Sequence, residues 1–271
     1  MEEAATEPLA GNVYVGTSGF VFDDWYGTVY PARLKPRETL AYYLNEFHFT
    51  ALELNVTFYR MPTSDFLGKF VARTPPAFPL AVKVHRDITH MPAPHPSREA
   101  ATLFMDAIAP LREAGKLAAL LLQFPYSFHR TAAHCDYVKE CRDAFPDVPL
   151  AVEFRHDSWH TNDIPPMLRD SGMSLCAVDE PRIQKLMPFS TRVTSPLGYV
   201  RLHGRNRAWF TAGEKERYNY DYSSRELDDI VSRIRSIAAQ TQKVLVFFNN
   251  CYMGRAVKNA YAVRERMAQA G

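Results

Sequence analysis

The sequence has few cysteines, and none of them forms a metal-binding or redox pair. The 271 residues include Cys135, Cys141, Cys176 and Cys251, and no two of these are spaced as CxxC. A chain of this length buries enough apolar surface to fold without disulfides. We therefore expect reduced thiols that pack as small hydrophobic side chains, and no zinc finger.

The sequence also lacks a strong net charge, a long apolar segment and a nucleotide-binding fingerprint. Its formal net charge of +2 provides no global field for nucleic acid. No run approaches the roughly 18 apolar residues of a membrane span, and the acidic residues 1–11 contain no apolar core of a secretion signal. Neither GxGxxG nor GxxxxGK[ST] occurs. These absences predict a cytoplasmic protein without membrane association, and residues 1–11 read as a flexible tail.

Eight short apolar runs, each bounded by turn residues, divide the rest of the chain. Most are almost continuously apolar, which is typical of strands buried on both faces of a parallel sheet. The runs lie at residues 12–17, 50–55, 79–84, 116–124, 149–154, 173–178, 198–203 and 243–249.

Helical patterns separate most of these runs. Pro36 opens one helix and Ser64 with Asp65 can cap another, while Ser223 and Glu226 have the spacing of a capping box. Further helices are expected at 97–114, 134–145 and 254–268. Strand and helix therefore alternate almost throughout.

Eight strand–helix units without a break in composition predict a single-domain (β/α)8 TIM barrel over residues 12–268. The sixth unit is irregular, because residues 180–196 have no helical period. A long loop, residues 205–222, follows the seventh strand and carries five aromatic residues among basic ones. We expect its aromatic rings to hold it against the barrel, although a lid or a surface that stacks bases would use the same composition.

Polar residues close every apolar run, at the strand ends where TIM barrels carry their active sites. A spacing of two places Glu53 with Asn55, Glu153 with Arg155, and Arg201 with His203 on one face of each strand. An unpaired buried charge costs several kcal/mol, so these groups must pair with each other or with a ligand. The pattern predicts a ligand site at the barrel mouth.

Seven short motifs, in order along nearly the whole chain, together resemble the YecE-like family, the domain of unknown function 72. The resemblance implies a TIM-barrel fold and supplies no chemistry. Val56, Tyr126 and Cys251 depart from the usual family pattern. The motifs are GTSG (16–19), ELNVTFYRMP (53–62), ITH (88–90), QFPYSF (123–128), EFRHDSW (153–159), YVRLHG (199–204) and FFNN (247–250).

Our first functional hypothesis is an enzyme that performs acid–base chemistry, of hydrolase, lyase or isomerase type, on a small anionic metabolite. Glu53 and Glu153 are the candidate base and acid, with His203 or His156 as proton relay. Lys83 could instead form a Schiff base if its pKa were depressed by neighbouring cations.

Three cations at the strand ends suggest that the substrate is an anion. The turns after the seventh and eighth strands contain Gly204 and Gly254, where barrels often hold phosphate, so the metabolite could be phosphorylated. No cofactor is expected under this hypothesis. The residues expected to bind substrate are Lys83, Arg155, Arg201, Asn55, Gln123, Asn249, Asn250 and Asp179.

Two other hypotheses remain open. Glu153, Asp179 and His203 end successive strands and could bind a divalent metal, as in xylose-isomerase-like barrels. Against this, the eighth strand offers Asn where those barrels supply another acid, and nearby arginines repel a cation. The third hypothesis is a nucleic-acid processing or binding protein that uses residues 205–222, which the near-neutral charge disfavours.

Overall fold

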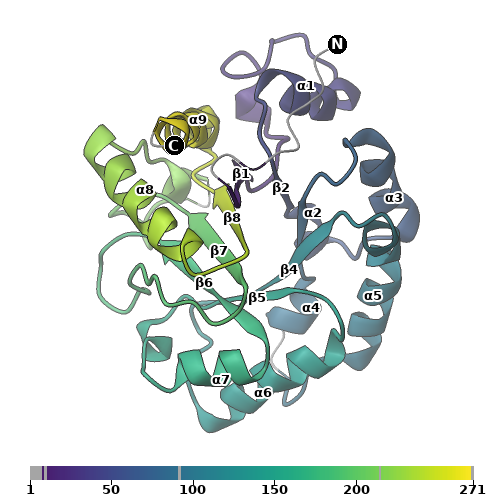
Figure 1. Ribbon diagram of the computed structural model, residues 1–271, viewed down its shortest axis with the longest axis vertical. Coiled ribbons are helices and arrows are strands. Elements are labelled where there is room, and N and C mark those ends of the chain that lie inside the picture. Colours follow the sequence, from purple (N-terminus) through teal and green to yellow (C-terminus); the bar gives the residue numbers. More distant parts are fainter. Residues whose placement is uncertain (1–7, 9–10, 91–92, 214, 270–271) are drawn as a thin grey trace.

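Eight parallel strands form the centre of the molecule in the computed structural model, which describes residues 8, 11–90, 93–213 and 215–269. The strands follow one another around the sheet in the order β1-β8-β7-β6-β5-β4-β3-β2, with helices outside them (Figure 1). This is the predicted single-domain TIM barrel. The strands are β1 (Val13–Thr17), β2 (Leu52–Leu54), β3 (Leu80–Lys83), β4 (Leu117–Gln123), β5 (Leu150–Glu153), β6 (Met173–Asp179), β7 (Leu197–Leu202) and β8 (Lys243–Phe248).

The helices confirm most of the predicted pattern. Ser223 caps α8 in the expected capping box with Glu226, and α5 and α9 begin and end close to the predicted residues. The sequence patterns did not identify α7, which begins with two prolines after Ile164, or the short helices α2 and α4. The helices are α1 (Thr39–Glu46), α2 (Val56–Tyr59), α3 (Ser64–Arg73), α4 (Arg86–Thr89), α5 (Arg98–Glu113), α6 (Ala132–Ala144), α7 (Ile164–Asp170), α8 (Ser224–Ala238) and α9 (Arg255–Ala268).

The sixth unit is irregular, as its sequence indicated. Residues 180–196 connect β6 to β7 without a helix. Most of the predicted tail, residues 1–7 and 9–10, lies outside the described residues. No helix in the part of the chain that the structure describes is long and apolar enough to cross a membrane.

The barrel closes between β1 and β2 through side chains as well as backbone. The Val15 N–H donates to Thr50 Oγ1 (2.9 Å), while the Thr50 N–H donates back to the Val15 carbonyl (3.0 Å). The buried Tyr43 hydroxyl accepts from the Thr17 N–H (3.0 Å) and donates to the Ala51 carbonyl (3.2 Å). These bonds satisfy backbone groups that a regular ladder would otherwise pair.

The inside of the barrel is filled unevenly. Alanines point inward from β3, β4 and β5 and from the residue before β2, whereas β7 and β8 supply large side chains, including Tyr199 and Phe247. Small residues on one side leave room for long side chains from the other. Tyr199 crosses this space, and its hydroxyl reaches Glu53 on β2 (2.6 Å).

The tight contact between β1 and β2 predicts that Gly16→Ala strongly destabilises the fold. A Cβ at Gly16 would lie 1.9 Å from the Ala51 carbonyl oxygen, a separation that the backbone must relieve by moving. We expect a loss of about 1–3 kcal/mol or more in the free energy of unfolding, measured by chemical denaturation.

Gly68→Ala is the matched control. Gly68 lies inside α3, and a Cβ there would meet nothing within 4 Å, so alanine should stabilise the helix by about 0.5–1 kcal/mol. Equal effects of the two substitutions would contradict this account of the β1–β2 contact.

Candidate functional site

An arginine on β7 joins two carboxylates from opposite parts of the barrel. Arg201 donates from Nη2 to Glu53 Oε1 (2.7 Å) and from Nε to Glu53 Oε2 (3.0 Å), a bidentate pair. Its Nη1 donates to Glu153 Oε2 on β5 (2.7 Å). All three side chains are at most 1% exposed. Charge-assisted bonds of this kind compensate the cost of burying the ions.

A second arginine extends this network toward the surface. Arg155 donates from Nε to Glu153 Oε1 (2.5 Å) and from Nη1 to Glu180 Oε2 (2.7 Å). The other Glu180 oxygen accepts from the Met187 N–H (3.0 Å). Arg155 Nη2 makes no hydrogen bond with any described residue, so it remains available to a ligand.

The network fixes the charge of Glu153. Burial raises the pKa of a carboxyl group, but Arg201 and Arg155 together hold the pKa of Glu153 well below its usual range. Burial raises the pKa of Glu180 to about 7, with Arg155 opposing the rise. Glu153 is therefore a fixed anion at neutral pH.

The buried His203 is neutral at neutral pH. Burial and then the nearby Arg155 lower the pKa of its ring to about 3. Its Nδ1 lies 2.8 Å from Asn249 Nδ2, an NH2 group that can only donate, so the ring hydrogen is on Nε2. That nitrogen faces Glu153 Oε1 at 3.4 Å.

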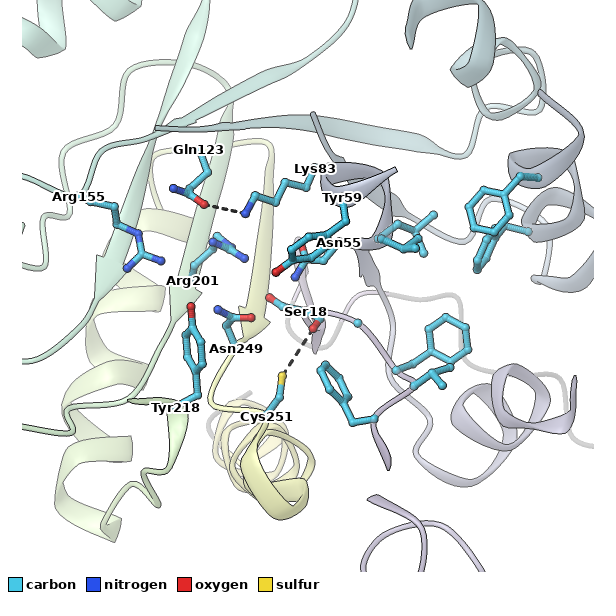
Figure 2. Close-up of a pocket in the computed structure, with 18 residues that line it drawn as sticks. Ser18, Asn55, Tyr59, Lys83, Gln123, Arg155, Arg201, Tyr218, Asn249 and Cys251 are labelled. Atoms are coloured by element: carbon cyan, nitrogen blue, oxygen red, sulfur yellow. Dashed lines mark hydrogen bonds between the residues drawn. The ribbon is translucent and has the colours of Figure 1, made fainter. Parts of the chain in front are cut away.

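A cavity of about 540 Å³ opens above this network at the C-terminal ends of the strands (Figure 2). Among the described residues, the charged ones that line it are Lys83, Arg155 and Arg201, and none is Asp or Glu. Asn55, Gln123 and Asn249 also line it. The structure thus brings six of the predicted site residues together around one space, whose charged lining in the described part of the chain is positive.

Lys83 is the cation of this cavity that lacks a carboxylate partner among the described residues. Its Nζ donates to Gln123 Oε1 (2.7 Å) and lies 3.8 Å from the centre of the Phe58 ring. Gln123 Nε2 donates to the Phe124 carbonyl (2.7 Å), which fixes the amide with its oxygen toward Lys83. Burial, followed by the charge of Arg201, lowers the pKa of Lys83 to about 7.

Two buried polar atoms beside the cavity have no hydrogen-bond partner within the described part of the chain. They are Ser18 Oγ and Asn55 Oδ1, and both residues line the cavity. Unsatisfied buried polar atoms are rare in folded proteins, and one explanation is a bound ligand.

The structure places six other predicted residues away from the cavity lining. Glu53, Glu153 and His203 lie beneath it and are fully buried. Asp179 accepts from Arg205 (2.8 Å) and from the Tyr222 hydroxyl (2.7 Å). The remaining two, discussed next, belong to separate clusters.

His156 and Asn250 face other parts of the protein. The His156 ring lies 3.9 Å from the ring of His129, centre to centre, and its Nδ1 accepts from the Ser158 N–H. Asn250 donates to the Tyr220 carbonyl (2.9 Å) and to Asn259 (2.7 Å). Neither residue reaches the space where Lys83 and the arginines converge.

The alternative metal ligands are not assembled. Glu153 and His203 are close, but the Asp179 carboxylate is bound by Arg205 and by the Tyr222 hydroxyl. Among the described residues, no three His, Cys, Asp or Glu side chains form a group that could hold a metal ion.

The loop at residues 205–222 is packed onto the barrel by several of its aromatic side chains. Trp209 is 5% exposed and Tyr222 is 4% exposed. The Tyr222 hydroxyl accepts from the Gly204 N–H (2.9 Å), and Tyr218 lines the cavity. Trp209 and Tyr222 are therefore not free to stack on bases, whereas Phe210 is 55% exposed.

The glycine turn before α9, which suggested phosphate binding, is occupied by the protein itself. The Met253 N–H donates to Asp24 Oδ2 (2.7 Å). A Cβ on the neighbouring Gly254 would lie 2.5 Å from Val29, so the loop after β1 covers this turn.

The sequence patterns did not identify the residues that bind the predicted site residues, or those that form the apolar side of the cavity. Glu180 directly follows the predicted Asp179, and Tyr199 shares the strand face of Arg201, so adjacency and spacing could have found both. Tyr218 and the apolar lining come from loops and helices, for which the sequence gives no comparable signal. The apolar lining residues are Phe20, Val21, Phe22, Leu54, Val56, Phe66 and Phe70.

Comparison with known proteins shows relatives over nearly the whole chain. Residues 14–271 match the family model described as protein of unknown function DUF72. The chain is 30% identical to the UPF0759 protein YunF of Bacillus subtilis (strain 168), covering 93% of this chain and 94% of that protein.

Solved structures agree in fold. A DUF72 family protein from Thermotoga maritima MSB8 is 38% identical, with a TM-score of 0.88 over 94% of this chain and 99% of the other. A DUF72 family protein from Enterococcus faecalis V583 is 29% identical, with a TM-score of 0.82 over 96% of each chain.

The contacts of Glu153 predict that Glu153→Gln destabilises the protein. The substitution keeps the shape but leaves Arg201 and Arg155 without the negative charge they share. Breaking a buried ion pair typically costs about 3–5 kcal/mol, or roughly 6–20 °C in Tm for a chain of this size. Thermal unfolding at pH 7 measures this.

Asp136→Asn serves as the control, because Asp136 pairs with Lys139 at the surface, where both side chains are more than half exposed. We expect a change below about 1 kcal/mol there. An unchanged Tm in Glu153→Gln would show that the network does not hold the barrel mouth.

Proposed function

The chain belongs to the DUF72 (UPF0759, YecE-like) family, as its motifs indicated, and from the barrel mouth we propose that it is an enzyme performing acid–base chemistry on a small anionic substrate. The observation that carries this proposal is a cavity that the described residues line with three cations and no acid, and in which Lys83 has an amide but no carboxylate as its partner. Such lining attracts an anion, since charges in a water-poor site interact strongly.

Lys83 is better suited to proton transfer than the two glutamates. Glu53 and Glu153 lie below the cavity with their oxygens bound to Arg201 and its neighbours. Lys83 lines the cavity, and a pKa of about 7 lets it both accept and release a proton near neutral pH. Gln123 Oε1 can accept a hydrogen from either form of the amine, so the side chain keeps its position.

The proposed reaction begins with neutral Lys83 removing a proton from the bound anion. The ammonium that forms pairs with the negative charge developing on the substrate, and Arg155 and Arg201 stabilise the same charge. Asn55 Oδ1 and Ser18 Oγ can each accept a hydrogen bond from a hydroxyl group of the substrate. The ammonium then returns the proton to a second position or to a leaving group.

The same amine supports a second candidate, attack on a carbonyl group. A neutral Lys83 could add to the carbonyl carbon, and loss of one water would leave an imine. Borohydride added with an oxo acid such as pyruvate would reduce this imine, and mass spectrometry would then find the added mass on Lys83. Unmodified Lys83 would favour proton transfer alone.

Solvent exchange tests the acid–base proposal without knowledge of the full reaction. The protein is incubated in D2O with a panel of small hydroxy, oxo and phosphorylated acids, and deuterium entering their C–H bonds is measured by NMR. We expect Lys83→Met to lower the exchange rate for the best substrate by about 10²–10⁴. The proposal would be contradicted if the unchanged protein and Lys83→Met incorporated deuterium at equal rates, or if no acid in the panel incorporated deuterium.

The pH dependence of stability gives a prediction that needs no substrate. The pKa of Lys83 is about 7 when folded and about 10.4 when unfolded, so the unfolded state binds more protons between these values and stability rises with pH there. Below pH 7 the cost of burying the charge is fully present. Lys83→Met should therefore stabilise the protein at pH 6, by about 1–3 kcal/mol after allowance for partial exposure, and by less at pH 9.

Lys116→Met is the matched control. Lys116 is buried, and its Nζ donates to the carbonyls of Val71 and Thr74 and to Thr74 Oγ1. Removing this amine leaves buried acceptors unpaired, and we expect destabilisation of about 1–3 kcal/mol. Thermal unfolding of both variants across pH 6–9 measures the difference, and destabilisation by Lys83→Met at pH 6 would refute the assignment of Lys83 as a desolvated cation without a carboxylate partner.

A further inference from the structure

The cavity has a charged half and an apolar half. Figure 2 shows Gln123, Lys83, Arg155, Arg201 and Asn249 together over the ends of the strands, and a group of unlabelled side chains without polar atoms on the opposite side. These belong to the loop after β1, the end of β2 with α2, and α3.

The apolar half is a packed aromatic wall. The Phe66 and Phe70 rings lie edge to face, 5.4 Å apart, and Phe20 meets Phe70 at 6.1 Å. Two hydrogen bonds anchor the loop that carries Phe20. The Tyr30 hydroxyl donates to the Phe20 carbonyl (2.7 Å), and the Nε1–H of the buried Trp25 donates to the Cys251 carbonyl (2.7 Å). The wall is thus held in place without a ligand.

Three of the six exposed large hydrophobic side chains in the described part of the chain lie at this wall. Val21 is 48% exposed, Val56 is 48% exposed and Tyr59 is 65% exposed, and all three line the cavity. A second cavity, of about 430 Å³, shares Val56 and Phe66 with the first. The rest of its lining mixes apolar and charged residues, so its apolar side is where a chain longer than a few carbons could lie. These residues are Arg60, Met61, Pro62, Thr63, Asp65 and Lys69.

We propose that the substrate is amphipathic: an anionic head, carboxylate or phosphate, binds Lys83, Arg155 and Arg201, and an acyl, alkyl or aryl group lies against Phe66, Phe70 and Val56. This inference rests on the proposed function for the location of the head and adds the class of molecule. A small, fully polar anion would leave the aromatic wall in water. An apolar group there removes that surface from water, which stabilises the complex.

A chain-length series tests the inference by isothermal titration calorimetry. The probes are acetate, butyrate, hexanoate and octanoate, then the matching alkyl phosphates, and the neutral alcohols of equal length. Each methylene that reaches the wall should tighten binding about fourfold, from about 0.8 kcal/mol per buried CH2. The heat-capacity change should become more negative along the series. The tighter of the two acid series identifies the head group.

Variants separate the wall from the head. Val56→Asp places a charge in the wall at the first residue of α2, where Asp is well tolerated. The binding affinity of this variant should depend less on the chain length of the acid. Leu103→Asp changes an equally exposed residue on α5, outside the cavity lining, and should leave the dependence on chain length unchanged. Lys83→Met should weaken every acid by a similar factor and keep the slope.

Each outcome decides a different claim. Acids that bind equally at all chain lengths would overturn the amphipathic substrate and leave the acid–base proposal intact. Alcohols that bind as tightly as the acids would overturn the anionic head. Absence of binding by every acid, short or long, would overturn both the inference and the proposed function.

Discussion

The contact between Arg201 and the two carboxylates of Glu53 and Glu153 is the interaction on which the barrel mouth depends. These residues lie on β7, β2 and β5, which are not neighbours in the sheet, so the guanidinium joins strands that share no backbone ladder. Burying any one of these three charges without a partner would cost folding free energy, because the side chains are only 0–1% exposed. With Arg155, the network contains two positive and two negative groups, and this balance of charge allows the network to stay largely buried.

This balance of charge determines which chemistry the network of arginines and glutamates can perform. A carboxylate whose pKa is held far below neutral pH by two arginines does not exchange protons at pH 7. Its role is to hold Arg201 and Arg155 in fixed positions at the edge of the cavity, where preorganised positive charge is most effective. In the proposed function, the glutamates that motivated the acid–base hypothesis from sequence are positioning residues, and the proton transfer is assigned to Lys83, which has no carboxylate partner among the described residues.

Much of the fold and part of the site followed from the sequence, for identifiable reasons. Parallel strands buried on both faces give continuous apolar runs, which predicted the barrel, and a period of two predicted that Arg201 and His203 share one face of their strand. The sequence could not say which polar residue faces the cavity and which lies beneath it, since that depends on side-chain length across the barrel. The sequence patterns also did not identify α7. Two prolines follow Ile164, and proline usually indicates the end of a helix, although the first turn of a helix tolerates it.

Two lysines, the buried Lys116 and the partly buried Lys83, differ in the partners that the fold gives their amines. Lys116 has an oxygen acceptor for each of the three hydrogens of its ammonium group, so the folded chain stabilises the charged form without help. Lys83 has one oxygen acceptor and the face of the Phe58 ring, and it lines a cavity in which no described lining residue is an acid. A fold gains no stability from a cation placed in this way. In the proposed function a negatively charged molecule supplies the missing partner, and the inferred amphipathic substrate places its apolar part against the neighbouring aromatic wall.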